Sequence, residues 1–195
     1  MALAKWYKID FHTHTPASTC FPNKAITADQ WLEAAKSSAM NAVVITDHNS
    51  VSFLRDIEKV KANYEEENKF KVFYGIELCV SAEFTHILII FDDILPLTTI
   101  EDAIISDLGL VRDDWNKTEV NVNEDRLGTL YNKLKNHIFI IPAHFASNKG
   151  LGKANINAIK KLNKLVDFSA YEVRNHADFE EFQKNFKTRQ LTPPH

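Results

Sequence analysis

The sequence is poor in glycine and cysteine, and it lacks any long apolar run. Five glycines among 195 residues leave little material for a loop that cradles phosphates, and no Walker or dinucleotide-binding motif is present. Cys20 and Cys79 are too few for a disulfide framework, so we expect reduced thiols. No segment approaches the roughly 20 apolar residues that cross a bilayer, and no signal peptide is evident. We therefore expect a cytoplasmic protein with no membrane partner.

The sequence also lacks an excess of basic residues. The 23 Lys and Arg residues against 26 Asp and Glu residues give a formal net charge of -3, which argues against binding of nucleic acid through a broad basic surface. Hydrophobic residues make up 45% of the chain and aromatic residues 11%, enough for a sizeable core. The length fits a single domain over residues 1–195.

Short apolar segments alternate with segments of helical spacing. We expect strands over residues 6–11, 41–47, 71–80, 85–92, 137–144 and 168–174. We expect helices over residues 27–39, 50–67, 127–135, 154–165 and 178–186. The segment 95–124 is interpreted as an insertion or loop with a short helix near 99–107. Apolar strands separated by helices predict a mainly parallel sheet covered by helices, hence an α/β fold.

Histidines and carboxylates gather at the ends of the predicted strands. His12 and His14 close the first strand, and because side chains alternate along a strand, both project from one side and are close enough to hold one metal ion. Other residues at strand ends are Asp47, His48, Glu77 and His144. His86 opens its strand instead, so it reaches the same rim only if that strand runs in reverse. Parallel α/β folds build active sites at this rim, and imidazole with carboxylate suits Zn, Mn or Fe.

Each of these residues also has a structural interpretation when it is taken singly. His86 could be a hydrogen-bonded core histidine, and Glu77 could be the partner of an ion pair. Asp10 shares the parity of the histidine pair, and such a carboxylate more often orients a ligand than binds the metal. His137 and His176 are interpreted as structural or surface residues.

Five motifs follow one another in chain order between Trp6 and about Asn175. They are Asp10-Phe11-His12-Thr13-His14-Thr15-Pro16-Ala17-Ser18, Thr46-Asp47-His48-Asn49, Gly75-Ile76-Glu77, His86, and Pro142-Ala143-His144. Together they resemble the PHP (polymerase and histidinol phosphatase) family of metal-dependent phosphoesterases. The resemblance implies an α/β fold of the distorted (βα)7 barrel type, with two or three divalent metal ions at its C-terminal rim.

The resemblance also implies roles for individual residues. His12 and His14 would bind a first metal ion. Glu77 would bridge it to a second ion, which His86 and His144 would hold. His48 would serve a third ion, and Cys20, at a position where the family often has histidine, could add a thiolate ligand.

The C-terminal part of the chain departs from the family pattern. Family members usually supply an Asp-x-His pair on a last strand, and none follows His144. Either this chain is the N-terminal part of a longer protein, or its barrel lacks the last strand or strands. The opening residues 6–18 also resemble PHP domains attached to ATPase-type partners, so an ATPase-type partner or fused domain is a hypothesis.

The leading functional hypothesis is hydrolysis of a phosphate ester by a metal-bridging hydroxide. Glu77 would set the metal spacing, and Asp47 would orient a ligand or carry a proton. Arg174 or Lys149 would neutralise charge on the phosphoryl oxygens. The substrate, a small molecule or a nucleic-acid end, stays open. The alternatives are a nuclease subunit or domain that acts with an ATPase-type partner, a catalytically silent structural or interaction module, and hydrolysis of a C–N bond.

Overall fold

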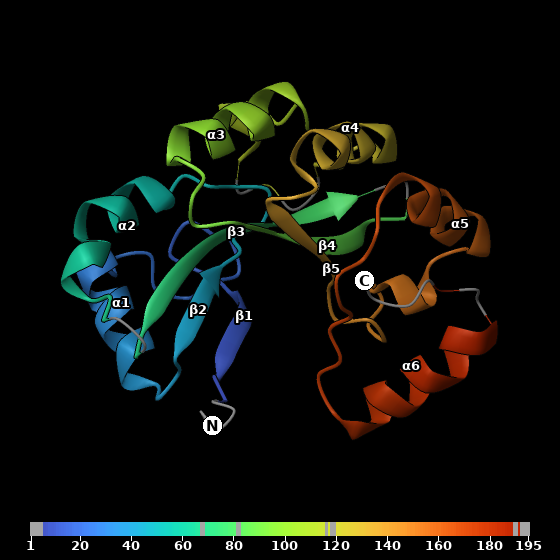
Figure 1. Cartoon of the computed structure of the whole chain (residues 1–195), viewed down its shortest axis with the longest axis horizontal. Coiled ribbons are helices and arrows are strands. Elements are labelled where there is room, and N and C mark those ends of the chain that lie inside the picture. Colours follow the sequence, from blue (N-terminus) through green and yellow to red (C-terminus); the bar gives the residue numbers. More distant parts are fainter. Residues whose placement is uncertain are drawn as a thin grey trace, which may run out of the picture.

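The protein is built on one curved, five-stranded sheet. The computed structural model describes residues 6–66, 69–80, 83–115, 117, 120–188 and 191. The strands are β1 (Ile9–Thr13), β2 (Ala42–Ile45), β3 (Lys71–Val80), β4 (Thr85–Phe91) and β5 (Ile138–Pro142). Their order in the sheet is the same as their order in the chain (Figure 1).

One strand of the sheet runs against the others. β1 pairs with β2, and β2 with β3, in parallel, whereas β4 is antiparallel to both β3 and β5. Only residues 81–84 separate β3 from β4 in the sequence, too few for the crossover that a parallel pair needs, so β4 must turn back. The expectation of a mainly parallel sheet therefore holds for strand direction but is wrong for pairing, since two of the four strand pairs are antiparallel.

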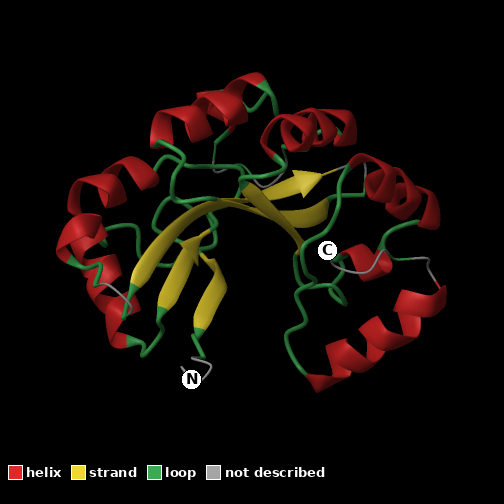
Figure 2. Cartoon of the chain, in the orientation of Figure 1, coloured by secondary structure: helices red, strands yellow, loops and turns green. Residues whose placement is uncertain are grey.

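Six helices accompany the sheet in the described part of the chain. They are α1 (Ala28–Ser37), α2 (Leu54–Val60), α3 (Leu97–Ser106), α4 (Glu124–Leu134), α5 (Ile156–Leu165) and α6 (His176–Thr188), with 3-10 turns η1 (Lys61–Asn63), η2 (Arg112–Asp114) and η3 (Leu151–Lys153). Figure 2 shows the helices in an arc around the outside of the sheet. Thr27 and Gln30 form the expected capping box before α1.

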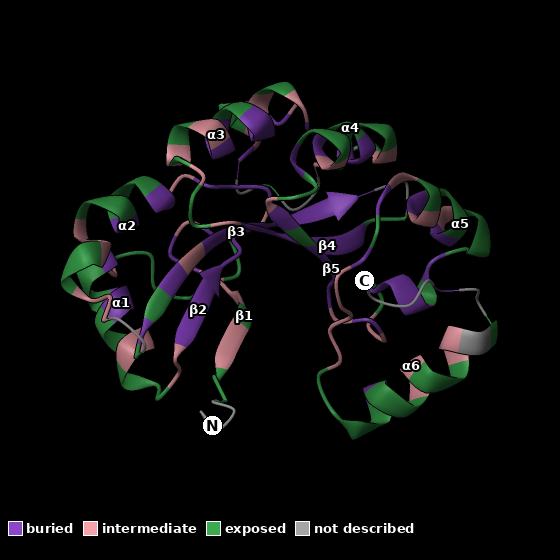
Figure 3. Cartoon of the chain, viewed as in Figure 1, coloured by how far each residue is buried: buried purple, intermediate pink, exposed green. Residues whose placement is uncertain are grey.

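Both faces of the central strands are buried, which explains their nearly continuous apolar sequences (Figure 3). Val43 and Ile89 belong to the large core that the sheet shares with the helices. Their neighbours Val44 and Leu88 point the other way, into a smaller apolar cluster on the inner face. In the described part of the chain the sheet and its helices thus form a half-barrel, which agrees with the expected α/β barrel that lacks its last strand or strands.

The segment 168–174, which we expected to be a strand, forms no regular strand. It follows β5, because Ser169 N donates to Ile140 O (2.8 Å) and Glu172 N donates to Pro142 O (3.1 Å). The return bonds of a ladder are missing. Ile140 N donates to the side-chain Oγ of Ser169 (3.2 Å) instead of to the backbone, and Pro142 has no N–H to donate.

The short helix expected near 99–107 in the segment 95–124 is confirmed as α3, and the segment also holds η2 and the buried Trp115. None of the helices in the described residues is long and apolar enough to span a membrane.

Candidate metal centre

Five histidines surround the carboxylate of Glu77. Oε1 of Glu77 lies 2.6 Å from His86 Nδ1 and 3.2 Å from His144 Nε2. Oε2 lies 3.0 Å from His48 Nδ1, 3.1 Å from His12 Nε2 and 3.4 Å from His14 Nε2. We call these six residues the Glu77 cluster. Glu77 itself is buried, while the four histidines that reach its oxygens from β1, β2 and β5 are partly exposed, so the cluster opens toward solvent on one side.

The strand order of the sheet produces this convergence. Glu77 lies in β3, the middle strand, and His86 lies in β4, where the reversed strand direction brings it to the same rim. His48 follows β2 and forms an isolated bridge with Glu77. His12 and His14 come from β1 and the residue after its end, and His144 follows β5.

Asn49 fixes the turn that presents His48. Its φ of 47° lies in the left-handed region, which asparagine tolerates better than most residues. Asn49 N donates to Glu77 O (2.8 Å), and its side-chain Oδ1 accepts from Cys79 N (3.2 Å). The turn after β2 is therefore tied directly to the strand that carries Glu77.

Three of the histidines share one arrangement of their ring nitrogens. In His12, His14 and His144, Nε2 faces Glu77. The opposite nitrogen, Nδ1, lies 3.0 Å from Glu172 Oε2 in His12, 3.1 Å from Ser18 Oγ in His14 and 2.5 Å from Ser147 Oγ in His144. An oxygen that holds Nδ1 fixes the ring orientation and leaves Nε2 for a metal, as is usual for metal-binding histidines.

Asp47 holds the loop that follows β1. Its Oδ1 accepts from Thr15 N (2.7 Å) and Ser18 Oγ (2.7 Å), and its Oδ2 accepts from Thr15 Oγ1 (2.5 Å). Because Ser18 Oγ donates to Asp47, it is left to accept from His14 Nδ1. Burial raises the pKa of Asp47, against the opposing effect of the hydrogen bonds from Thr15 and Ser18.

Burial and neighbouring charges shift the pKa values of the cluster members in different directions. Burial would raise the pKa of Glu77, but the close imidazoles of the surrounding histidines outweigh burial and lower it. Burial would lower the pKa of His12, yet Glu172 and Glu77 on its two sides raise it to about 10. Burial, with the nearby charges of other histidines, lowers the pKa of His14 to about 4, and burial lowers that of His86. Glu172 has a lowered pKa, because its bond with His12 outweighs burial.

The donor atoms fit a divalent metal ion. Three groups have ligand atoms within 4.8 Å of one another: His12, His14 and Glu77; His48, Glu77 and His86; and His14, Cys20 and His48. His12 Nε2 and Glu77 Oε2 are buried, and neither atom has a hydrogen-bond partner among the described residues. Buried polar atoms without a partner are costly in a protein unless an ion or water satisfies them. Imidazole and carboxylate donors suit Zn, Mn or Fe.

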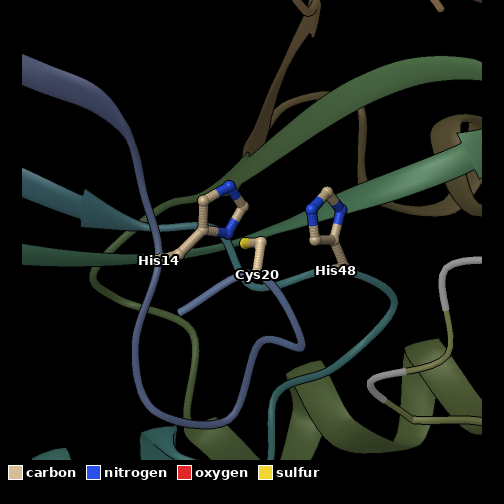
Figure 4. Close-up of side chains that lie close together, drawn as sticks. All are labelled: His14, Cys20 and His48. Atoms are coloured by element: carbon tan, nitrogen blue, oxygen red, sulfur yellow. The ribbon is translucent and has the colours of Figure 1, made fainter. Parts of the chain in front are cut away.

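Cys20 belongs to the third of these groups. Figure 4 shows its sulfur between the rings of His14 and His48. The loop that Asp47 anchors carries Cys20, and this loop is exposed at that residue. Burial of the thiol raises the pKa of Cys20, so a metal would have to displace the proton for the sulfur to bind as thiolate.

The structure brings together every residue that the sequence proposed as a metal ligand: His12, His14, Cys20, His48, Glu77, His86 and His144. Arg174 and Lys149, the two residues proposed to neutralise charge on a phosphoryl group, are not among the residues that contact Glu77. Arg174 Nε pairs with Asp178 Oδ2 (2.9 Å) in α6, so it is directed toward that helix. Lys149 accepts a hydrogen bond from His86 N through its backbone oxygen (2.9 Å), and its side chain is exposed.

Sequence reasoning missed Glu172. The available signal was its position near the end of the apolar segment 168–174, because the other candidate ligands also lie near the ends of apolar segments. Asp10, in contrast, accepts from the backbone N of His12 (3.2 Å) rather than from its ring.

Comparisons with known proteins link this geometry to a family. The family model described as PHP domain matches residues 10–191. An amidohydrolase from Chromobacterium violaceum, solved with bound sulfate and no metal, is similar with a TM-score of 0.58 at 14% identity, over 94% of this chain and 84% of that one. A protein from Bifidobacterium adolescentis, assigned provisionally as a metal-dependent phosphoesterase, is similar with a TM-score of 0.55 at 13% identity, over 95% and 85% of the two chains. At such identities the likeness shows the fold. No curated protein matches.

Proposed function

This chain belongs to the PHP domain family, and on that premise we propose that it hydrolyses phosphate esters with divalent metal ions held by the Glu77 cluster. The observation that carries the proposal is the convergence of five imidazoles on one buried carboxylate. A structural ion pair needs one partner for Glu77, whereas five partners with inward-facing nitrogens form a ligand set.

The two oxygens of Glu77 divide the ligands into two sides. On the Oε2 side, His12 and His14 would hold one ion, as the resemblance to the family implies. On the Oε1 side, His86 and His144 would hold another. The carboxylate between them would keep the ions at a fixed spacing. Bound divalent ions would neutralise charge on a phosphoryl group and lower the pKa of water at the site.

Asp47 acts as a positioning residue in this proposal. Both of its oxygens are taken by Thr15 and Ser18, which favours orientation of a ligand over transfer of a proton. Lys149 is better placed than Arg174 to meet a phosphoryl group, because Arg174 is already paired with Asp178.

Metal analysis combined with a substrate panel tests the proposal. The purified chain is loaded with Mn²⁺ or Zn²⁺, its metal content is measured, and it is assayed on p-nitrophenyl phosphate, bis(p-nitrophenyl) phosphate, a short single-stranded oligonucleotide and a p-nitroanilide. We expect cleavage of at least one phosphate ester. Cleavage of the anilide alone would overturn the proposal in favour of C–N bond hydrolysis, and no cleavage at all would favour a silent module.

Matched variants show whether any activity belongs to the cluster. Glu77→Gln and His12→Ala should lose both metal and activity. His176→Ala should lose neither, because His176 is an exposed histidine that pairs with Glu180 on α6 (3.3 Å). Equal activity in Glu77→Gln and wild type would place the chemistry elsewhere.

A further inference from the structure

Glu172 contacts two members of the Glu77 cluster with one oxygen. Its Oε2 lies 3.0 Å from His12 Nδ1 and accepts a hydrogen bond from the backbone N of His144 (2.6 Å). These residues are 160 and 28 positions away in the sequence. The side chain of Glu172 is 26% exposed and that of His12 is 15% exposed, so the contact is partly shielded from water.

The contact with His12 is on the side of the ring that faces away from Glu77. The other nitrogen, Nε2, is buried, lies 3.1 Å from Glu77 Oε2 and makes no hydrogen bond within the described part of the chain. A carboxylate on Nδ1 keeps a proton there, so that Nε2 is the nitrogen that would give up its proton and offer a lone pair to a metal ion. Such a pair also increases the basicity of the ligand nitrogen.

The contact with His144 stabilises a strained turn. His144 has a φ of 32°, in the left-handed region that residues with a side chain rarely adopt. Glu172 holds this turn twice, since its carboxylate accepts from His144 N and its backbone oxygen accepts from Phe145 N (3.0 Å). Ser147 completes the turn through its backbone N, which donates to His144 O (2.8 Å).

His12 differs from the other histidines in the charge of its outer partner. His14 and His144 hold neutral serine hydroxyls at Nδ1, whereas His12 holds a carboxylate. Because His12 faces Oε2 of Glu77 and His144 faces Oε1, Glu172 connects one histidine from each group of ligands.

We propose that Glu172 is a positioning residue of the metal centre, which orients His12 through Nδ1 and locks the turn that presents His144. The inference depends on the metal centre of the proposed function, but not on the reaction that the centre performs. It assigns a role to the segment 168–174, whose backbone follows β5 and brings the carboxylate to the rim.

The affinity for Zn²⁺ alone tests this role. Glu172→Gln keeps the size of the side chain and removes its charge, and we expect Zn²⁺ binding to weaken about 10–100-fold, the usual effect of losing such a partner. Glu172→Asp restores the charge and should bind more tightly than Glu172→Gln. Glu180→Gln is the matched control, because it removes a carboxylate that pairs with the surface His176, and its Zn²⁺ affinity should equal that of wild type.

Two further measurements separate positioning from other roles. Thermal unfolding of the metal-free variants reports damage to the fold, and equal melting temperatures with unequal Zn²⁺ affinities support positioning. NMR of the metal-free protein reports the Nδ1 proton of His12, which should exchange slowly in wild type and rapidly in Glu172→Ala.

The proposal is overturned if Glu172→Gln binds Zn²⁺ within twofold of wild type, or if it loses as many Zn²⁺ ions as Glu77→Gln, which would make Glu172 a direct ligand. Should wild type bind no Zn²⁺, the NMR measurement decides, and a rapidly exchanging His12 Nδ1 proton in wild type refutes the contact. Tight Zn²⁺ binding without hydrolysis would refute the proposed function and leave this inference standing.

Discussion

Zinc should raise the melting temperature of the metal-free protein, and Glu77 should be responsible for the rise. A ligand that binds only the folded state at 100 times its dissociation constant adds about 2.7 kcal/mol to the free energy of unfolding. For 195 residues the entropy of unfolding is about 0.4 kcal/mol per kelvin. The two values give an expected rise of about 7 °C. Scanning fluorimetry of chelator-treated protein, with and without Zn²⁺, measures it.

Glu77→Gln should reduce this rise to less than about 2 °C at the same Zn²⁺ concentration, which corresponds to an affinity roughly 30-fold weaker or worse. The reason lies in the geometry of the carboxylate. Each oxygen of Glu77 faces at least two imidazole nitrogens, so both sides of the cluster lose a ligand together. A glutamine offers one neutral oxygen, and its amide nitrogen cannot bind a cation.

Glu101→Gln is the matched control, since it changes a second buried glutamate in the same way. Glu101 lies in α3 and accepts from Arg55 Nε and Nη2 (both 2.5 Å). Its loss should lower the melting temperature of the metal-free protein but leave the zinc-induced rise at about 7 °C. An equal rise in Glu77→Gln and Glu101→Gln, or no rise in wild type, would refute the assignment of the metal centre.

Three further outcomes are expected. Zn²⁺ should slow alkylation of Cys20 about tenfold, since the thiol would be held as a ligand. The buried Cys79 should stay unreactive in both conditions. Equal alkylation rates of Cys20 with and without Zn²⁺ would remove it from the ligand set. The hydrogen bond from Arg55 lowers the pKa of Glu101. The stability that Glu101 contributes is therefore present above its unfolded pKa and is lost as the pH falls through its folded pKa. In urea titrations between pH 7 and pH 3, the free energy of unfolding should fall more steeply in wild type than in Glu101→Gln, and parallel curves would contradict the pairing of Glu101 with Arg55. Gly150→Ala would place a Cβ 2.3 Å from the backbone oxygen of His144. This clash should lower the free energy of unfolding by about 1–3 kcal/mol and weaken Zn²⁺ binding. A variant as stable as wild type in urea would show that this contact relaxes.

The convergence of the candidate ligands could be predicted because most of these residues lie at strand ends in the sequence. His48 and His144 lie shortly after the apolar strands β2 and β5, and the rim of an α/β sheet brings such residues together. The reversal of β4 was implied by His86, which had to lie at the opposite end of its strand to join the others. The short connection after β3 provides the physical cause of that reversal.

Other features depended on contacts that the sequence pattern does not encode. The segment 168–174 has the composition of a strand, but the bond from Ile140 N to the Ser169 hydroxyl and the missing donor of Pro142 prevent a ladder. Glu172 was missed for a related reason. Whether its carboxylate faces the rim depends on how that irregular segment lies against β5, which alternation along a strand cannot predict.

The position of Glu77 also ties the Glu77 cluster to the pairing of the strands. Glu77 N donates to Asp47 O (3.1 Å), and Asn49 N donates to Glu77 O, so the turn after β2 is bonded to β3 on both sides of His48. On the other side, Glu77 pairs with Leu88 of β4, the strand that carries His86. The pairing of β3 with its two neighbours therefore brings a carboxylate and two imidazoles together, and β1 and β5 contribute the others. Because the donors lie on or shortly after all five strands, the unfolded chain has no comparable site, and metal binding would become part of the free energy of folding.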